Sequence, residues 1–195
     1  MPAKKDHIIP DTFGLVVCGG TSSRMEADKS LLRYPIYEML LPHCERVFLS
    51  CSEEQAVNIS TGYHFLTDLP MYKNSGAFGA LLTGLSIFPG KDILFIGCDF
   101  PFLTGPELKH FLDHCKGEKA VAFYNEKEEL YQPLLAWYPE RSVDQLKKMF
   151  AEKQFSLQQY LRLSGAVKIC PKNKKSITLV DTPVEFNKAP EGVKA

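Results

Sequence analysis

The chain has 195 residues, of which 45% are hydrophobic and 24% charged, and these values are typical of one sizeable globular domain. Lysine plus arginine number 23, and aspartate plus glutamate also number 23, so the formal net charge is zero. Sequence-independent binding of nucleic acid needs an excess or a stripe of basic residues to contact the phosphates. The balanced charge argues against such binding. Any anion site is therefore expected to be local.

Targeting and redox signals are also weak. Residues 1–12 hold no apolar stretch of the kind found in a signal peptide, and no run approaches the ~20 apolar residues of a membrane helix. The six cysteines form no C-x-x-C pair, so neither a zinc knuckle nor a thioredoxin-type site is predicted. We expect reduced cysteines and a cytoplasmic protein without a membrane attachment.

Short apolar runs rich in β-branched and aromatic residues predict buried strands. They span residues 13–18, 47–51, 92–98, 120–124 and 134–138, with weaker candidates at 167–170 and 177–180. Helical spacing predicts helices at 31–44 and 77–88, and the patterns Thr104–Glu107 and Ser156–Gln159 predict helix starts with reciprocal caps. Strands that alternate with helices favour βαβ units and a mostly parallel sheet. The polar ends, 1–10 and 187–195, are expected to fray.

In such a sheet the ligand crevice lies beyond the carboxyl ends of the strands. The first strand runs into Gly19 and Gly20, which let the backbone approach an anion closely, and Arg24 and Lys29 follow in the same loop. The loop is neither a Walker A motif nor a G-x-G-x-x-G fingerprint. Phosphate binding and a plain polar strand-to-helix loop remain equal interpretations of this segment.

Two carboxylates follow predicted strands. Asp99 ends the apolar run at 92–98, where a lone charge is costly unless a positive group meets it. Mg²⁺ held by a carboxylate and substrate phosphates would fit, and so would backbone N–H donors in the next turn. Asp68 precedes Lys73 and a glycine-rich helix start at Gly76 and Gly79, for which an ordinary loop is the favoured interpretation.

The segment 131–134 (YQPL) precedes the last of the stronger strand patterns. Gln132 could form hydrogen bonds to the edge of a heterocyclic base, because its side-chain amide both donates and accepts hydrogen bonds. Without further context we expect a plain β-turn here.

Five segments in order, covering residues 13–186, resemble the molybdenum cofactor guanylyltransferases, the MobA-like nucleotidyltransferases. They are VVCGGTSSRMEADKSLL, DLPMYKNSGAFGALLTGL, GCDFPFL, YQPLLAWYP and VDTPVEF. The resemblance implies a three-layer αβα sandwich with a mostly parallel, Rossmann-like sheet, of the nucleotide-diphospho-sugar transferase type. It implies one domain over 1–195, with its core at 13–186.

The resemblance also implies an activity, namely the Mg²⁺-dependent transfer of GMP from GTP to the phosphate of molybdenum–molybdopterin cofactor, with release of pyrophosphate. GTP and the molybdopterin cofactor would be the substrates, with transient contact to proteins that deliver or receive the cofactor. Such a reaction needs positioning and charge stabilisation rather than a covalent protein nucleophile.

Site residues carry over from the family position by position. Arg24 and Lys29 would neutralise the triphosphate, Asp68 would contact the guanosine, and Asp99 would hold Mg²⁺ between the enzyme and the phosphates. The remaining nucleotide contacts implied by the resemblance are Val17, Cys18, Gly19, Gly20 and Ser50.

Departures from the family pattern leave alternatives open. Glu26 stands where the family has glycine, Leu179 and Asp181 replace two asparagines, and the span from Lys29 to Cys44 is shorter than the pattern implies. One alternative is a relative that uses CTP or another phosphate acceptor. Another is a non-catalytic nucleotide-binding protein whose site has been weakened.

Overall fold

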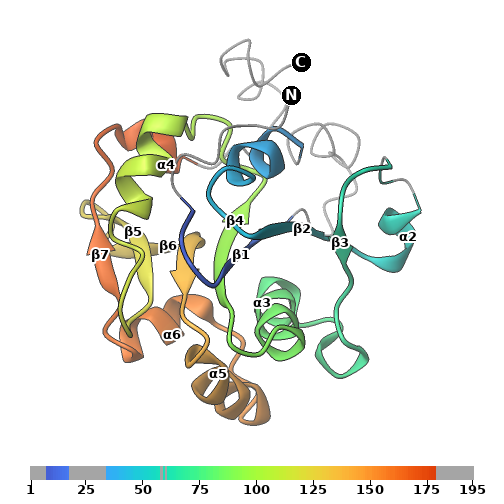
Figure 1. The fold of residues 1–195 in the computed structure, drawn as a ribbon. Coiled ribbons are helices and arrows are strands. Elements are labelled where there is room, and N and C mark those ends of the chain that lie inside the picture. The colour runs from blue at the N-terminus through green and yellow to red at the C-terminus, as the bar shows by residue number, and fades with distance from the viewer. Residues whose placement is uncertain (1–7, 18–33, 58, 60, 179–195) are drawn as a thin grey trace.

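A seven-stranded sheet forms the centre of the structure (Figure 1), a computed structural model that describes residues 8–17, 34–57, 59 and 61–178. The strands lie in the order β3-β2-β1-β4-β6-β5-β7. Their bounds are β1 (Thr12–Val17), β2 (Arg46–Ser50), β3 (Phe65–Leu66), β4 (Asp92–Gly97), β5 (Val121–Asn125), β6 (Leu130–Tyr138) and β7 (Val167–Ile169).

The direction of the strands confirms the predicted sheet type. β1 is parallel to β2 and β4, β2 to β3, and β5 to β7, while β6 runs antiparallel to both β4 and β5. β6 reverses because only residues 126–129 separate it from β5, and a connection so short can join antiparallel strands only. The sheet is therefore mostly parallel, as the alternation of strands and helices predicts.

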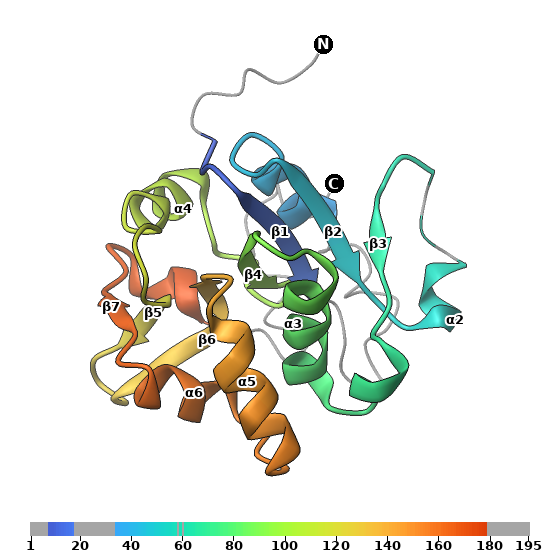
Figure 2. The same ribbon diagram turned by 60° about the horizontal axis from the view of Figure 1, so that its bottom comes forward.

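Helices cover both faces of the sheet (Figures 1 and 2). Their bounds are α2 (Glu53–Ala56), α3 (Gly76–Ile87), α4 (Gly105–Leu112), α5 (Ser142–Ala151) and α6 (Leu157–Leu163), with 3₁₀ turns η1 (Pro70–Tyr72) and η2 (Lys174–Ile177); residues 34–40 are also helical. Within the described residues, none of the helices has the length and hydropathy needed to cross a bilayer.

Two hydrophobic clusters, one on each face, hold the layers together. On one face, Leu40 of the helical residues 34–40 and Phe111 of α4 pack with Val16 of β1. On the other face, residues of α3, α5 and α6 belong to one cluster with Leu15 of β1. Because neighbouring residues of a strand point to opposite faces, a fully apolar strand is expected between two helical layers. The three-layer αβα sandwich is confirmed.

The predicted bounds differ from the observed ones mainly late in the chain. The strand predicted at 134–138 begins at Leu130 instead. The weak strand prediction at 177–180 is wrong at its start, because Ile177 belongs to the 3₁₀ turn η2; residues 179 and 180 lie outside the described residues. In the predicted helix 31–44, the described helical residues are 34–40.

The predicted caps have different outcomes. At α6 the Ser156 hydroxyl accepts the Gln159 N–H at 3.1 Å, but the Gln159 side chain bonds Gln154 instead of returning to the cap. At α4 the reciprocal cap is wrong, because Thr104 makes no side-chain cap bond. The buried Glu107 carboxylate instead accepts the backbone N–H groups of residues 172 and 173, at 2.8 and 3.0 Å. It therefore ties α4 to the segment after β7.

We expect Glu107→Ala to lower the free energy of unfolding by about 3 kcal/mol, because two backbone donors would lose a charged acceptor. Glu107→Gln keeps one acceptor oxygen and should cost less. Urea denaturation of both variants measures the difference. A Glu107→Ala protein as stable as the wild type would contradict this role.

Candidate active site

The carboxyl ends of four parallel strands meet in one row. Val17 of β1 lies opposite Ser50 of β2 on one side and opposite Gly97 of β4 on the other, and Leu66 of β3 lies opposite Ser50. In Figure 2 the arrowheads of β1 and β2 point toward the same end of the sheet. This edge is where open α/β sheets bind their ligands.

Two carboxylates stand just beyond this row, at opposite ends. Asp68 follows Leu66 by two residues, and Asp99 follows Gly97 by two residues. The order β3-β2-β1-β4 places three strand spacings between them, or roughly 14 Å at the usual spacing. One elongated ligand can therefore contact both carboxylates, with different parts of the molecule at each end.

Asp99 is anchored through its neighbours in the chain. Cys98 and Phe100 are both buried, and the Cys98 N–H donates to the Val17 carbonyl oxygen at 3.0 Å. The Asp99 carboxylate folds back over Gly97, since a Cβ at position 97 would lie 2.6 Å from its Oδ1 and 3.2 Å from the Leu134 Cβ. Gly97 thus provides the space that the carboxylate occupies.

The neighbouring strand β6 is irregular beside Asp99. Its pairing with β5 shifts between Ala122 and Tyr124, so that Tyr124 lies opposite Tyr131. Pro133, which cannot donate a ladder hydrogen bond, lies in this bulge, and its carbonyl accepts the Tyr138 hydroxyl at 2.9 Å. The β-turn predicted at 131–134 is therefore wrong, because these residues belong to β6 (Leu130–Tyr138).

Asp68 occupies a partly buried position on a well-fixed segment. Burial raises the pKa of its carboxyl group, and the attraction of Lys73 partly offsets that rise. The next residue, Leu69, donates its N–H to the buried Thr83 hydroxyl of α3 at 3.0 Å. The Leu69 carbonyl in turn accepts the N–H groups of Tyr72 and Lys73. The Asp68 carboxylate thus belongs to a turn that is held to α3 by a hydrogen bond.

Lys73 and Glu53 form a contact that the sequence analysis missed. The Lys73 Nζ donates to the Glu53 Oε1 at 2.8 Å. Glu53 opens α2, where Ser52 and Gln55 form a capping box with bonds of 3.0 and 3.2 Å. The S-x-x-Q pattern at 52–55 could have revealed this helix start. No pattern in the sequence reveals the ion pair.

The helix α3 begins at the same edge, because it connects β3 to the parallel strand β4 and so must run back along the sheet. Its glycines have structural reasons to be there. Gly76 has a φ of +57°, and a Cβ on Gly79 would strike the backbone oxygen of Tyr72. These contacts agree with the predicted ordinary loop before the helix and do not themselves require a ligand.

The predicted site residues fall into two groups. Val17, Ser50, Asp68 and Asp99 lie along one edge of the sheet, as expected. The other predicted residues, Cys18, Gly19, Gly20, Arg24 and Lys29, lie outside the described residues. Val17, the described residue that precedes them in the sequence, lies in the middle of the row.

Metal ligands are sparse in the part of the chain that the structure describes. There, no three His, Cys, Asp or Glu residues gather into a group that could hold an ion. A site built on one protein carboxylate would need the substrate's own phosphates as further ligands, which is how Mg²⁺ is often bound.

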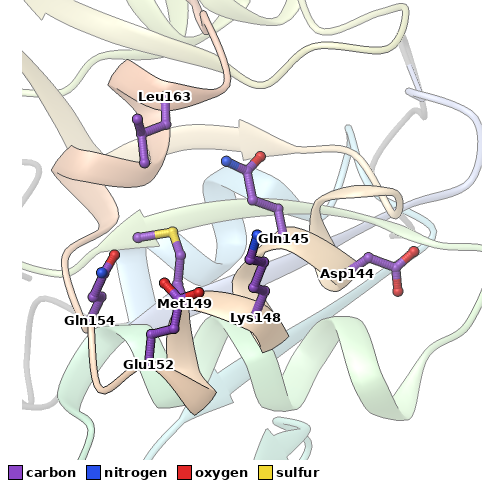
Figure 3. A pocket seen from close by; sticks show the side chains of 7 residues that line it. All are labelled: Asp144, Gln145, Lys148, Met149, Glu152, Gln154 and Leu163. Atoms are coloured by element: carbon purple, nitrogen blue, oxygen red, sulfur yellow. The ribbon is translucent and has the colours of Figure 1, made fainter.

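A separate hollow of about 470 Å³ lies between α5 and α6 (Figure 3). Its lining combines charged, amide and apolar side chains, namely Asp144, Gln145, Lys148, Met149, Glu152, Gln154 and Leu163. None of these residues follows one of the four strands whose ends form the row. We therefore place the candidate site at the carboxyl edge of the sheet and not in this hollow.

The mostly parallel sheet between two helical layers, with strand ends lined up along one edge, defines an α/β protein of the Rossmann-like class. Residues 14–167, most of the chain, match the family of MobA-like NTP transferase domains. The chain belongs to this family and is therefore a nucleotidyltransferase.

Two curated relatives are similar in sequence. The molybdenum cofactor biosynthesis bifunctional protein of Synechocystis sp. is 24% identical over 186 residues, which cover 89% of this chain and 52% of the relative. This chain thus spans about half the length of that relative. A probable molybdenum cofactor guanylyltransferase of Rhodopirellula baltica is 27% identical over 171 residues, covering 80% of this chain and 81% of the relative.

Two solved structures share the fold. The molybdopterin-guanine dinucleotide biosynthesis protein A of Archaeoglobus fulgidus superposes with a TM-score of 0.72 at 22% identity, over 94% of this chain and 99% of the other. The 2-C-methyl-D-erythritol 4-phosphate cytidylyltransferase of Francisella tularensis gives 0.68 at 8% identity, over 91% and 98%. These two proteins are named for different nucleotides but share this fold. The fold alone therefore does not determine which nucleotide base the protein binds.

Proposed function

We propose that this protein transfers GMP from GTP to the phosphate of molybdenum–molybdopterin cofactor, with Mg²⁺ as the cofactor. The observation that carries the proposal is the placement of Asp68 and Asp99 at the two ends of one row of strand ends, in a chain of the MobA-like family. The names of the Synechocystis and Rhodopirellula relatives support the choice of substrates.

The reaction is a displacement at the α-phosphorus of GTP. An oxygen of the acceptor phosphate forms a new bond to that phosphorus, and the bond to the bridging oxygen of the β-phosphate breaks. Pyrophosphate leaves with the bonding electron pair, and the product contains a new P–O–P linkage. Catalysis then consists of placing the attacking oxygen in line and offsetting the negative charge of the phosphates.

The residues at the β4 end fit a magnesium ion. The Asp99 carboxylate offers oxygen ligands, its backbone is anchored by buried neighbours, and the glycine at 97 leaves space for it. When bound, Mg²⁺ would neutralise phosphate charge and orient the leaving group. Arg24 and Lys29 would supply further positive charge from the loop after β1.

The residues at the β3 end fit a guanine base. A carboxylate accepts hydrogen bonds only, and guanine presents two adjacent donors, its ring N1–H and its 2-amino group. Adenine, cytosine and uracil lack that pair of donors. Asp68 would therefore favour GTP, while Val17, Ser50 and the segment from Cys18 to Gly20 would contact the rest of the nucleotide.

Titration calorimetry of the purified chain with GTP, CTP, ATP and UTP, each with and without Mg²⁺, tests the proposal. We expect binding of GTP in preference to the other three, strengthened by Mg²⁺. A preference for CTP would keep the reaction class but overturn the substrate. The absence of binding to all four nucleotides would contradict an active nucleotidyl site.

A further inference from the structure

Two histidines lie four residues apart at the end of α4. His110 belongs to the helix, and His114 lies in the turn that follows it, where its N–H still donates to the Phe111 carbonyl oxygen at 3.0 Å. The two rings are neighbours, with centroids 5.3 Å apart and planes at 82° to each other. Residues at this spacing share one face of a helix, and helical zinc sites present two of their ligands in this way.

A backbone carbonyl orients each ring. Nε2 of His110 lies 3.3 Å from the Cys170 carbonyl oxygen, and Nδ1 of His114 lies 2.9 Å from the His110 carbonyl oxygen. Because a carbonyl oxygen only accepts hydrogen bonds, each of these nitrogens must donate. In the neutral imidazole the other nitrogen, Nδ1 of His110 or Nε2 of His114, then carries a lone pair. Histidines that bind metal ions ordinarily have this arrangement, in which one nitrogen donates to a carbonyl and the other binds the ion.

The carbonyl that orients His110 is itself held in place. Cys170 directly follows β7, and the backbone N–H groups of residues 172 and 173 donate to the buried Glu107 carboxylate of α4, at 2.8 and 3.0 Å. The segment after β7 is therefore tied to the same helix that carries His110. This orientation is built into the fold, so less order has to be imposed when a ligand binds.

The separation of the rings fits one tetrahedral ion. Zinc lies about 2.0–2.1 Å from a ligating nitrogen, and the centre of an imidazole lies about 1.1 Å behind that nitrogen, so two ligating rings have centroids roughly 5 Å apart. Within the described residues no three His, Cys, Asp or Glu side chains form a metal-binding group, so water would fill the remaining positions. Imidazole suits Zn²⁺, Cu²⁺ and Ni²⁺, whereas Mg²⁺ takes oxygen ligands.

We propose that His110 and His114 form a binding site for a divalent transition-metal ion, with Zn²⁺ as the ion that fits the spacing of the two rings. The site uses neither Asp68 nor Asp99, so this inference does not depend on the proposed function. An ion held by both rings would join α4 to the turn that ends it. Since it would bind the folded chain only, it should also raise the melting temperature.

Titration calorimetry of the full chain with Zn²⁺ alone compares the wild type with His110→Gln and His114→Asn. The glutamine amide can replace the Nε2–H donor and the asparagine amide the Nδ1–H donor, so both variants keep the bond to the carbonyl and lose the imidazole lone pair. We expect each variant to bind this Zn²⁺ at least tenfold more weakly. Even the loss of a group that only orients a metal ligand costs about 10- to 100-fold. Thermal melts without metal check that both variants fold.

Two further variants serve as controls. His64→Gln removes an exposed histidine that contacts the Phe48 ring, at 5.8 Å between centroids, and Cys170→Ser removes an exposed thiol but keeps the carbonyl that bonds His110. Both should bind Zn²⁺ as the wild type does. Zinc binding that survives unchanged in His110→Gln and His114→Asn would overturn the inference, and so would its loss in Cys170→Ser, which would place the ion on the thiol. Because no nucleotide is present, neither result bears on the proposed function.

Discussion

Asp99→Asn is expected to lower kcat by roughly three orders of magnitude, which corresponds to about 4 kcal/mol of lost transition-state stabilisation. Asparagine keeps the shape of the side chain and removes its negative charge, so the change tests the charge that would hold Mg²⁺. The small residual activity should respond only weakly to added Mg²⁺. Turnover of GTP with the acceptor cofactor, measured over a Mg²⁺ titration, gives both results.

The control for this substitution is Asp144→Asn, which removes an exposed carboxylate from α5. It should keep wild-type turnover and the wild-type response to Mg²⁺. Thermal melts of both variants check that the fold is intact. If Asp99→Asn retained Mg²⁺-dependent turnover within a few-fold of the wild type, Asp99 would not be the metal ligand.

Much of the architecture follows from periodicity. Residues 13–18 and 92–98 hold no charged side chain apart from Asp92, which opens the second run, as expected for strands covered on both faces. The structure confirms them as β1 and β4 with ends moved by one residue. The rule that ligands bind at the carboxyl ends of parallel strands then brings Ser50 and Asp99 to one edge. Their common location needs only parallel strands, which the alternation of strands and helices predicts.

Features that depend on tertiary contacts could not be predicted in this way. The pattern Thr104–Glu107 predicts a reciprocal cap, but the Glu107 carboxylate finds backbone donors more than sixty residues away. The bulge around Pro133 arises because a strand continues through a residue that lacks an N–H, where local preference favours a turn. The pair of Lys73 and Glu53 joins the segment after β3 to the first turn of α2, which follows β2, and these two segments are neighbours because β2 and β3 are neighbours in the sheet.

Gly97→Ala is expected to lower kcat about 100-fold, the effect of displacing a reacting group by about 1 Å, with a stability cost of only about 1 kcal/mol. An added Cβ would lie 2.6 Å from the Asp99 Oδ1, closer than atoms can approach. The end of a short side chain can move aside more easily than backbone can, so the carboxylate would leave its place while the fold survives. Half-maximal activity should then need more Mg²⁺.

Gly84→Ala provides the matched control for Gly97→Ala. A Cβ there would also be crowded, at 3.2 Å from the Leu15 Cδ2, but it would meet apolar side chains of the sheet instead of a carboxylate. Neither glycine has a positive φ, so backbone strain does not separate the two substitutions. Gly84→Ala should therefore change stability by a similar amount and leave turnover near the wild-type value. Equal losses of turnover in the two variants would mean that general crowding, and not the displacement of Asp99, explains the effect at Gly97.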